Sequence, residues 1–222
     1  MATYVLIHGA ADSAWFWHLL EAELRKRDQD VVAVDLPCDD DSAGLSEYTD
    51  TVVDAIGART DLVVVAQSFG GFTAPLVCER VPVDLLVMLA GMIPSPGERP
   101  GDWWTNTGYE SPEQDDDATG DEAVIASFLH DVPHELAVEA LKRGRDQSGT
   151  PMEEPWPLEE WPDVPTRFLL CRDDRFFPAE FMRQVARDRL GITPDEIDGS
   201  HCVALSRPQE LAERLEMFRA EL

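Results

Sequence analysis

Residues 62–71 read Leu62-Val63-Val64-Val65-Ala66-Gln67-Ser68-Phe69-Gly70-Gly71, and this stretch decides the fold. It begins with an apolar, β-branched run, which is typical of a strand buried on both faces of a sheet. A serine follows at once, and residues 69–80 then have the pattern of a helix. A serine on such a strand-to-helix turn is held in a strained backbone conformation that lifts its hydroxyl clear of the sheet.

The turn predicts a nucleophile at Ser68. Small residues two positions away on either side, Ala66 and Gly70, allow the chain to bend sharply there. The N–H of Phe69 would lie at the start of a helix, where it can donate to a developing oxyanion. Alanine rather than glycine at the first small position weakens the motif as a bare pattern, and a serine that only caps a helix is the alternative interpretation.

Apolar runs of the same kind recur along the chain and alternate with helical patterns. This alternation favours the α/β class, with a parallel or mostly parallel sheet of about six strands and helices on both faces. We expect residues 1–222 to form one domain. The predicted strands cover residues 3–8, 31–35, 62–67, 83–90, 166–171 and 193–197, and the predicted helices cover residues 16–28, 46–59, 69–80, 121–130, 134–144, 178–190 and 208–222.

The alternation stops between residues 94 and 165. This segment is rich in proline, glycine, tryptophan and acidic residues, including the aspartates 115–117. It is too long for a plain loop, so we expect an inserted helical lid over the sheet. Its aromatic residues predict an apolar substrate pocket, although for any one of them packing against the core is an equally good interpretation. The residues concerned are Trp103, Trp104, Tyr109, Phe128, Trp156 and Trp161.

Candidate acid and base residues follow the last two predicted strands. Asp173 and Asp174 come directly after residues 166–171, and His201 lies in a loop of small residues after residues 193–197. The carboxyl ends of parallel strands meet at one edge of a sheet, so these side chains are expected near Ser68. We expect one aspartate, Asp174, to orient His201 and the other to be a solvated turn residue. The order serine, aspartate, histidine along the chain is the one this fold uses.

The loop after the first predicted strand, His8-Gly9-Ala10, is where a second oxyanion donor is needed, and the N–H of Ala10 can supply it. We interpret His8 as a structural hydrogen-bonding residue rather than the base. His130 and His134 have the spacing of a metal pair, but Pro133 between them breaks the helix that would align them. We therefore expect no metal. Trp15 and Trp17 are interpreted as packing residues.

Composition excludes several classes of protein. The chain has 44 acidic and 18 basic residues, a formal net charge of −26, so neither nucleic acid nor an anionic membrane is an expected partner. No apolar run of about 18 residues is present, and no signal peptide is recognisable, so we expect a cytosolic protein. The 4 cysteines are scattered and form no CxxC pair, which argues against a zinc site or a disulfide framework.

The motifs together resemble the plant-type branch of the α/β-hydrolases that contains methyl-ester esterases and hydroxynitrile lyases. The resemblance runs along nearly the full chain, through VLIHGA (5–10), AQSFGG (66–71), DDRFFPAEF (173–181) and GSHCVALSRPQELAE (199–213), and is weakest between residues 94 and 165. It implies that Asp174 is the acid and that Ala10 and Phe69 are the oxyanion donors. Lyases of this branch carry a threonine after the first histidine and a lysine after the catalytic one. Gly9 and Cys202 occupy those positions here, which favours an esterase.

We therefore expect a serine hydrolase that cleaves a small to medium hydrophobic carboxylic ester through Ser68, His201 and Asp174, with an acyl-enzyme intermediate and no cofactor. Two alternatives stay open: a C–C lyase that uses the same three residues, and a non-catalytic protein that holds a small ligand. A homodimer is also compatible with the sequence.

The scarcity of lysine predicts a salt requirement. Only Lys26 and Lys142 are lysines, and acidic residues spread over a whole globular chain resemble the surface of a halophilic protein. Because the Debye length falls to about 3 Å at 1 M ionic strength, salt screens the repulsion between carboxylates. We expect the melting temperature and the activity to rise from low to molar salt, measured by calorimetry and ester turnover. An unchanged melting temperature would contradict a halophilic surface.

Overall fold

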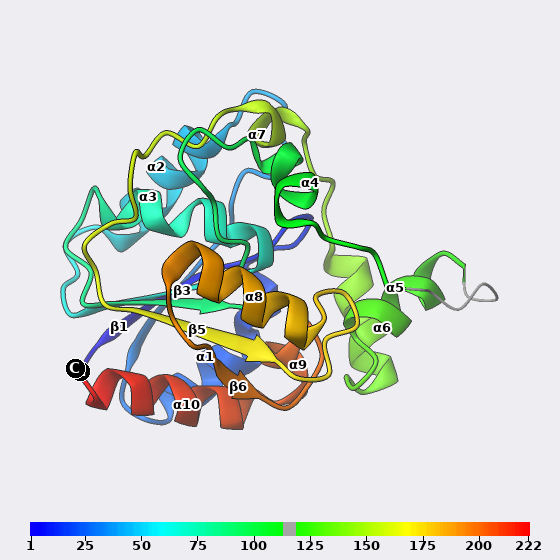
Figure 1. Ribbon diagram of the computed structural model, residues 1–222. Helices are drawn as coiled ribbons and strands as arrows, with labels where there is room; N and C mark the ends of the chain where they lie inside the picture. The colour runs from blue at the N-terminus through cyan, green and yellow to red at the C-terminus, as the bar shows by residue number, and fades with distance from the viewer. Residues whose placement is uncertain (113–118) are drawn as a thin grey trace.

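The computed structural model describes residues 1–112 and 119–222. The aspartates at 115–117 therefore lie outside the described residues. Six strands form one sheet in the order β2-β1-β3-β4-β5-β6 (Figure 1), and every neighbouring pair is parallel. The strands are β1 (Thr3–Ile7), β2 (Asp30–Val34), β3 (Leu62–Gln67), β4 (Leu85–Leu89), β5 (Thr166–Cys171) and β6 (Asp195–Ile197). The predicted α/β class and the six-stranded parallel sheet are confirmed.

The strand order places a switch point between β1 and β3, the second and third strands of the sheet. The chain leaves β1 for β2 on one side and then crosses to β3 on the other, so β1 has both as neighbours. Connections that leave a parallel sheet in opposite directions open a crevice outside the carboxyl ends of the strands, where ligands bind in α/β folds. The segments that follow β1 and β3 are therefore the expected walls of a site.

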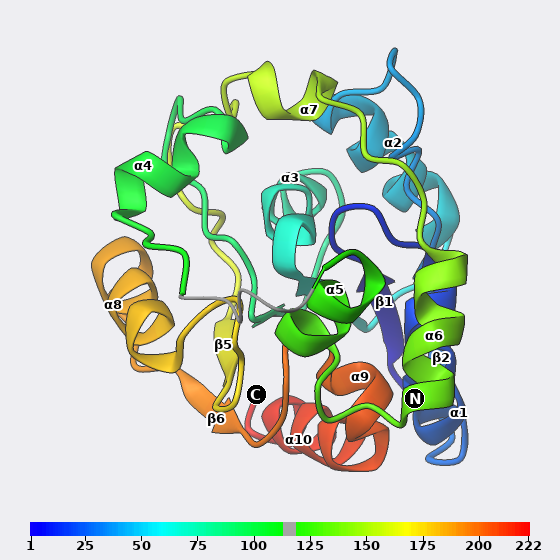
Figure 2. The ribbon, with the colours of Figure 1, turned by 90° about the vertical axis from the view of Figure 1, so that its right-hand side faces the viewer.

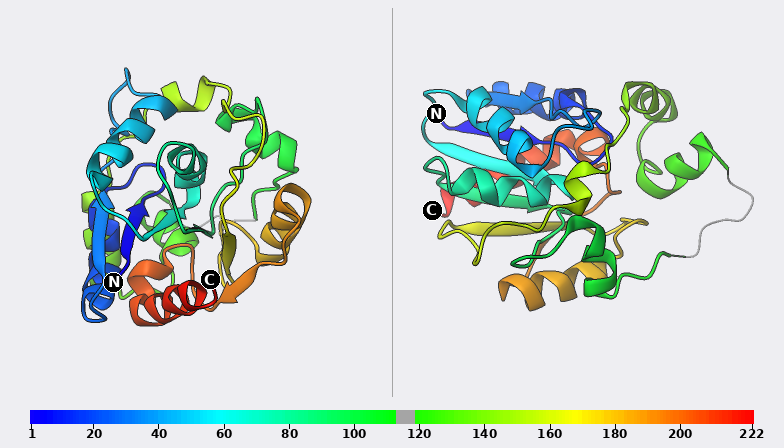
Figure 3. Two further views of the ribbon diagram at one scale, coloured as in Figure 1. Left: turned by 90° about the vertical axis from the view of Figure 1, so that its left-hand side faces the viewer. Right: turned by 90° about the horizontal axis from the view of Figure 1, so that it is seen from above.

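Helices cover both faces of the sheet, as Figure 3 shows from two further directions. Apolar residues of α2, α3 and α8 pack on one face, and those of α1, α9 and α10 pack on the other. The helices are η1 (Ala14–Trp17), α1 (His18–Arg25), α2 (Leu45–Ile56), η2 (Ser68–Phe72), α3 (Ala74–Cys78), η3 (Pro100–Asp102), α4 (Trp103–Thr107), α5 (Asp121–Phe128), α6 (His134–Arg143), α7 (Thr150–Glu153), α8 (Ala179–Leu190), α9 (Val203–Ser206) and α10 (Pro208–Ala220).

Burial on both faces explains the apolar runs. Within β3, Val64 and Ala66 belong to the core on the α2 side, whereas Val63 and Val65 belong to the core on the α1 side. Each strand of the sheet centre must therefore be apolar at every position instead of at alternate ones. The same requirement places the hydrophobic stripes of the helices toward the sheet.

The single helix predicted over residues 69–80 is instead two short ones. Residues 68–72 form the 3₁₀ helix η2, and α3 begins only at Ala74. Pro75 lies in the first turn of α3, where its missing N–H removes no helical hydrogen bond. A continuous helix would have required that N–H, so the proline divides the segment.

The segment between β4 and β5 contains η3 and α4–α7. Figure 2 shows α4 and α7 along the upper edge of the molecule, α5 near the centre and α6 at the right. Figure 1 shows α5 and α6 beyond the arrowheads of the strands. The helices predicted at 121–130 and 134–144 correspond to α5 and α6. In the part of the chain that the structure covers, no helix is long and apolar enough to cross a membrane.

A buried ion pair attaches the start of this segment to α8. Arg189 on α8 pairs with Glu98, and the distance from Arg189 Nη2 to Glu98 Oε1 is 2.8 Å. The Glu98 side chain is only 3% exposed and also accepts hydrogen bonds from Asn106 Nδ2 and from the backbone N–H of Ser95. Removing one partner of a buried pair leaves the other charge uncompensated, which destabilises a fold strongly.

We expect Arg189→Ala to lower the free energy of unfolding by about 3 kcal/mol because it leaves the Glu98 carboxylate buried and unpaired. Urea denaturation followed by circular dichroism measures the change. Arg187→Ala is the matched control, because Arg187 is an exposed residue of the same helix. It is expected to change the free energy of unfolding by less than about 0.5 kcal/mol. Equal losses in the two variants would show that the buried pair has no special role.

Candidate active site

Ser68 lies at the turn between β3 and η2 with a φ of 51°, in the left-handed region that residues with a side chain rarely adopt. Close backbone contacts hold this strained turn. A Cβ atom on Gly70 would lie 2.7 Å from the carbonyl oxygen of His8, and one on Gly71 would lie 2.1 Å from that of Met92. The glycines are therefore required by the approach of η2 to β1 and to the loop after β4. The N–H of Met92 also donates to the carbonyl of Ser68 at 2.9 Å.

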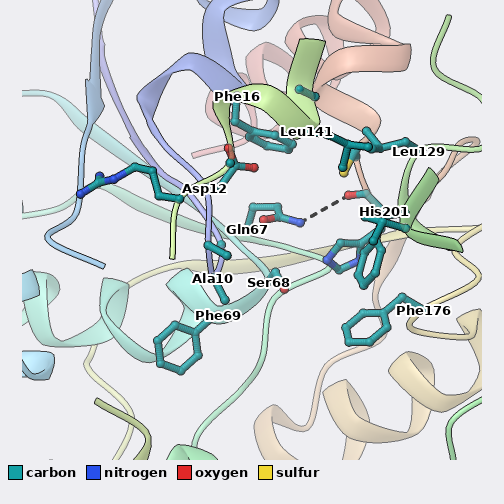
Figure 4. A pocket seen from close by; sticks show the side chains of 18 of the residues that line it. Ala10, Asp12, Phe16, Gln67, Ser68, Phe69, Leu129, Leu141, Phe176 and His201 are labelled. Carbon is teal, nitrogen blue, oxygen red and sulfur yellow. Dashed lines mark hydrogen bonds between the residues drawn. The ribbon is translucent and has the colours of Figure 1, made fainter. Parts of the chain in front are cut away.

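Asp174 and His201 form a buried pair. The distance from His201 Nδ1 to Asp174 Oδ2 is 2.7 Å, and the two residues are 3% and 6% exposed respectively. The other oxygen of Asp174 accepts hydrogen bonds from the N–H groups of Phe176 and Phe177, at 2.8 and 2.9 Å. These contacts fix the carboxylate, which in turn holds the proton on Nδ1 and leaves Nε2 as an acceptor. Figure 4 shows a ring nitrogen of His201 turned toward Ser68.

Asp173 has a different position. Its Oδ2 accepts a hydrogen bond from the N–H of Gly199 at 3.0 Å, and its own N–H donates to the Gly199 carbonyl at 3.1 Å. His130 Nε2 donates to the carbonyl of Asp173 at 2.8 Å. Asp173 is exposed and joins the turn after β5 to the loop that carries His201. Of the two neighbouring aspartates, Asp174 is the one that faces the imidazole.

The predicted oxyanion donors lie on two sides of Ser68. Ala10 follows β1 and Phe69 is the second residue of η2, and both line the same cavity as Ser68. Within residues 1–112 and 119–222, neither backbone N–H donates a hydrogen bond. Two N–H groups that lie beside a serine hydroxyl and have no acceptor can both donate to an oxyanion that forms between them.

His8 is a structural residue, as predicted. It is fully buried, its Nδ1 donates to the carbonyl of Gly9 at 2.7 Å, and its Nε2 accepts from the N–H of Leu36 at 3.1 Å. Burial lowers the pKa of His8 to about 4. The ring is therefore neutral at pH 7 and holds the loop that carries Ala10.

Ser68 and His201 open into a cavity of about 1000 Å³. Phe128 and Phe176 line it near His201, with ring centroids 5.5 and 5.4 Å from the imidazole. Figure 4 shows Phe176 beside His201. Trp104 also lines the cavity. Of the residues predicted for the pocket, Trp104 and Phe128 lie at it.

The prediction that Trp103 and Trp156 line the pocket is not supported. Both are buried in the core on the α2 side of the sheet. Trp103 Nε1 donates to the carbonyl of Ile93 at 2.9 Å, and Trp156 Nε1 donates to that of Phe72 at 3.1 Å. Each indole therefore satisfies its only donor inside the protein and anchors the segment between β4 and β5, a role that the sequence left equally open.

Several residues that line the cavity were not predicted from the sequence. Phe176 lies within the motif around Asp174, and Gln67 directly precedes Ser68; both line the cavity. The Gln67 Nε2 donates weakly to the His201 carbonyl at 3.4 Å, so it bridges the two loops. Position at a strand end could have indicated both residues. The other apolar members come from segments far apart in the sequence: Phe16, Met92, Leu129, Leu141, Met152 and Leu205.

Charged and thiol groups in the cavity wall have shifted pKa values. Burial, with a further contribution from nearby Asp35, raises the pKa of Asp12 to about 6. Burial raises the pKa of the Cys202 thiol well above its ordinary value. Cys202 is therefore neutral at pH 7. Among the residues that the structure describes, no group of histidine, cysteine, aspartate and glutamate side chains could hold a metal ion.

Known proteins resemble this chain over nearly its whole length. Norfluorocurarine synthase 1 of Strychnos is 24% identical over 259 residues, covering 96% of this chain and 93% of that protein. The rice protein named "Probable esterase PIR7A" is 27% identical over 250 residues, covering 96% and 94%. The crystal structure of polyneuridine aldehyde esterase superimposes with a TM-score of 0.81 at 20% identity, covering 98% of each chain.

The family comparison covers most of the chain. The sequence model described as "Alpha/beta hydrolase family" matches residues 4–214, from β1 into α10. The sheet, the turn at Ser68 and the position of His201 after the last strand agree with this match. The chain therefore belongs to the alpha/beta hydrolase family.

Proposed function

We propose that the protein is a serine hydrolase that cleaves carboxylic esters through Ser68, His201 and Asp174. The observation that carries this proposal is the buried hydrogen bond of 2.7 Å between His201 Nδ1 and Asp174 Oδ2, with Ser68 on a strained turn beside it. A buried carboxylate that holds an imidazole in one tautomer equips the histidine to accept a proton from a serine. Relatives that include a probable esterase support ester hydrolysis.

The reaction is acyl transfer to water. His201 Nε2 removes the proton of Ser68, and the serine oxygen attacks the ester carbonyl. The oxyanion of the tetrahedral intermediate accepts hydrogen bonds from the N–H groups of Ala10 and Phe69, each worth roughly 2.7–4 kcal/mol of the barrier. His201 then protonates the leaving alcohol. Water repeats the sequence on the acyl-enzyme and releases the acid.

The cavity favours a small to medium ester with an apolar part. Its wall beside His201 is aromatic, formed by Phe128 and Phe176, and Trp104 adds a further ring. The segment between β4 and β5 contributes Trp104 and Phe128, so it covers the reacting groups as a lid and helps to exclude water.

The residue that follows His201 favours hydrolysis over cleavage of a carbon–carbon bond. A lyase that releases cyanide needs a cation to stabilise the departing anion. The residue that follows His201 is Cys202. Burial raises the pKa of its thiol, so the side chain is neutral and offers no positive charge. Turnover of p-nitrophenyl acetate without turnover of mandelonitrile would separate the two activities.

A fluorophosphonate probe tests the nucleophile directly. We expect the purified protein to be labelled at Ser68 and Ser68→Ala to be neither labelled nor active on p-nitrophenyl esters, a loss of at least about 10⁴-fold in kcat. Mass spectrometry locates the label. Ser206→Ala is the matched control and should label normally, because Ser206 does not line the cavity. A folded protein that does not label would indicate a ligand-binding protein without catalysis.

The two neighbouring aspartates give a second test. Asp174→Asn should lower kcat by about 10⁴-fold, because an amide no longer holds the productive tautomer of His201. Asp173→Asn removes an exposed charge but keeps an oxygen that can accept from the N–H of Gly199, and it should lower kcat by no more than about tenfold. Ester hydrolysis at saturating substrate measures both. Equal losses would mean that the pair at Asp174 has no special role in the reaction.

A further inference from the structure

Asp12 places a carboxylate in the wall of the cavity that contains Ser68. It lies in the loop between β1 and η1 and is partly buried. One oxygen, Oδ1, accepts a hydrogen bond from the N–H of Ser13 at 2.8 Å. Among the described residues, the other oxygen has no hydrogen bond and no ion pair. Figure 4 shows the Asp12 side chain among those of Phe16, Gln67 and the other residues that line the cavity.

No basic side chain in the described wall neutralises Asp12. The guanidinium of Arg145 lines the same cavity, but it pairs with Asp39 and donates to the carbonyl of Leu36 at 2.9 Å. The charged group that acts on Asp12 most directly is another acid, Asp35, whose Oδ1 accepts a hydrogen bond from the N–H of Ala14. Asp12 therefore carries a negative charge at neutral pH that no described residue balances.

The surroundings of Asp12 contain two neutral thiols. Cys38 Sγ donates to the backbone carbonyl of Asp12 at 3.5 Å, and the carboxylate of Asp12 is close enough to Cys202 to help raise the pKa of that thiol. Burial raises the pKa of Cys38 as well. The titratable groups that face Asp12 from neighbouring elements are thus Asp35 and these thiols, and none of them supplies a positive charge.

The rest of the cavity wall also carries negative charge. Asp121 and Asp146 also line it, and among the described residues Arg145 is the only lysine or arginine that does; Asp39 already neutralises it. The whole chain adds a formal charge of −26. A cavity with this field concentrates cations and repels anions.

We propose that Asp12 selects esters that carry a positively charged ammonium group, so that the proposed esterase has cationic substrates. The carboxylate pairs with the ammonium, and the ring of Phe16, which lines the same cavity, offers a π face that attracts cations. The negative wall also favours release of the carboxylate product. This inference rests on the proposed hydrolysis and specifies the substrate class of that site.

A matched pair of esters tests this selection. One carries a permanent positive charge, p-nitrophenyl 4-(trimethylammonio)butanoate, and the other is its neutral isostere, p-nitrophenyl 5,5-dimethylhexanoate. Homologues with one and two more methylene groups in both series cover the reach from Ser68 to Asp12. The measured quantity is the ratio of kcat/KM for the cationic ester to that for the neutral ester. Steps common to both esters cancel in this ratio.

The expected ratio for the best chain length exceeds one, and Asp12→Asn should lower it about fivefold, the size of a partly exposed ion pair. Asp54→Asn is the matched control. Asp54 is exposed on α2, so this variant removes the same unit of charge far from the cavity and should leave the ratio unchanged. Molar salt should lower the ratio of the unmodified protein toward that of Asp12→Asn, because salt screens the attraction.

The pH dependence provides an independent readout. The trimethylammonium group does not titrate, and His201 serves both esters equally. Since burial and Asp35 raise the pKa of Asp12 to about 6, the carboxylate gains its charge as the pH rises through that value. The ratio should therefore increase between pH 5 and pH 7, a range of about one unit on either side of that pKa, and should be flat in Asp12→Asn.

The outcomes separate this inference from the proposed function. Hydrolysis of the neutral ester with a ratio near one at every chain length, unaltered in Asp12→Asn, would overturn the selection by Asp12 and leave the hydrolase intact. A ratio that Asp54→Asn lowers as much as Asp12→Asn does would also overturn it, because the effect would then come from net charge alone. Failure to cleave either ester, together with failure of Ser68 to react with a fluorophosphonate, would overturn the proposed hydrolysis itself.

Discussion

The close approach of η2 to its neighbours is the constraint on which the site depends. Gly70 packs against the carbonyl of His8 and Gly71 against that of Met92, at distances that leave no room for a side chain. This packing holds Ser68 in the left-handed conformation, which costs of order 1–3 kcal/mol for a residue with a side chain. The serine hydroxyl, the N–H of Phe69 and the loop after β1 are thereby fixed relative to one another.

The parallel sheet extends this constraint to the other groups. Because all six strands run in one direction, the segments after β1, β3, β5 and β6 meet at the same edge. Asp174 then needs only the turn after β5 to reach His201, and Asp173 ties that turn to the loop of His201 through Gly199. Neutral His8 supports the loop that carries Ala10. The candidate reacting groups thus follow the strands of the core, and the segment between β4 and β5 supplies much of the cavity wall.

The cavity combines two kinds of chemistry. Aromatic rings surround His201, whereas carboxylates line other parts of the wall, among them Asp12, which has no ion-pair partner within residues 1–112 and 119–222. An acidic surface is a common way to remain soluble in salt, but a half-buried carboxylate beside another acid costs free energy of folding. Such a group in a cavity that contains the proposed nucleophile is a candidate for recognition rather than for solubility. The negative charge of this wall would attract the cationic substrate proposed above.

The sequence by itself determined the sheet and the identities of the candidate reacting residues. Strands that are buried on both faces must be apolar at every position, so the bounds of β3 and β5 could be predicted to the residue. Reactive groups of an α/β fold follow the carboxyl ends of its strands, so only the few polar residues there were candidates. The sequence favoured Asp174 over the adjacent Asp173, but only the tertiary structure shows the direction of each side chain, that of Asp174 toward His201 and that of Asp173 toward Gly199. The tertiary structure also decided that Trp103 and Trp156 lie in the core. Composition cannot distinguish an indole that packs in the core from one that lines a cavity, since both are large and apolar. The structure distinguishes them here because each Nε1 donates to a backbone carbonyl inside the protein.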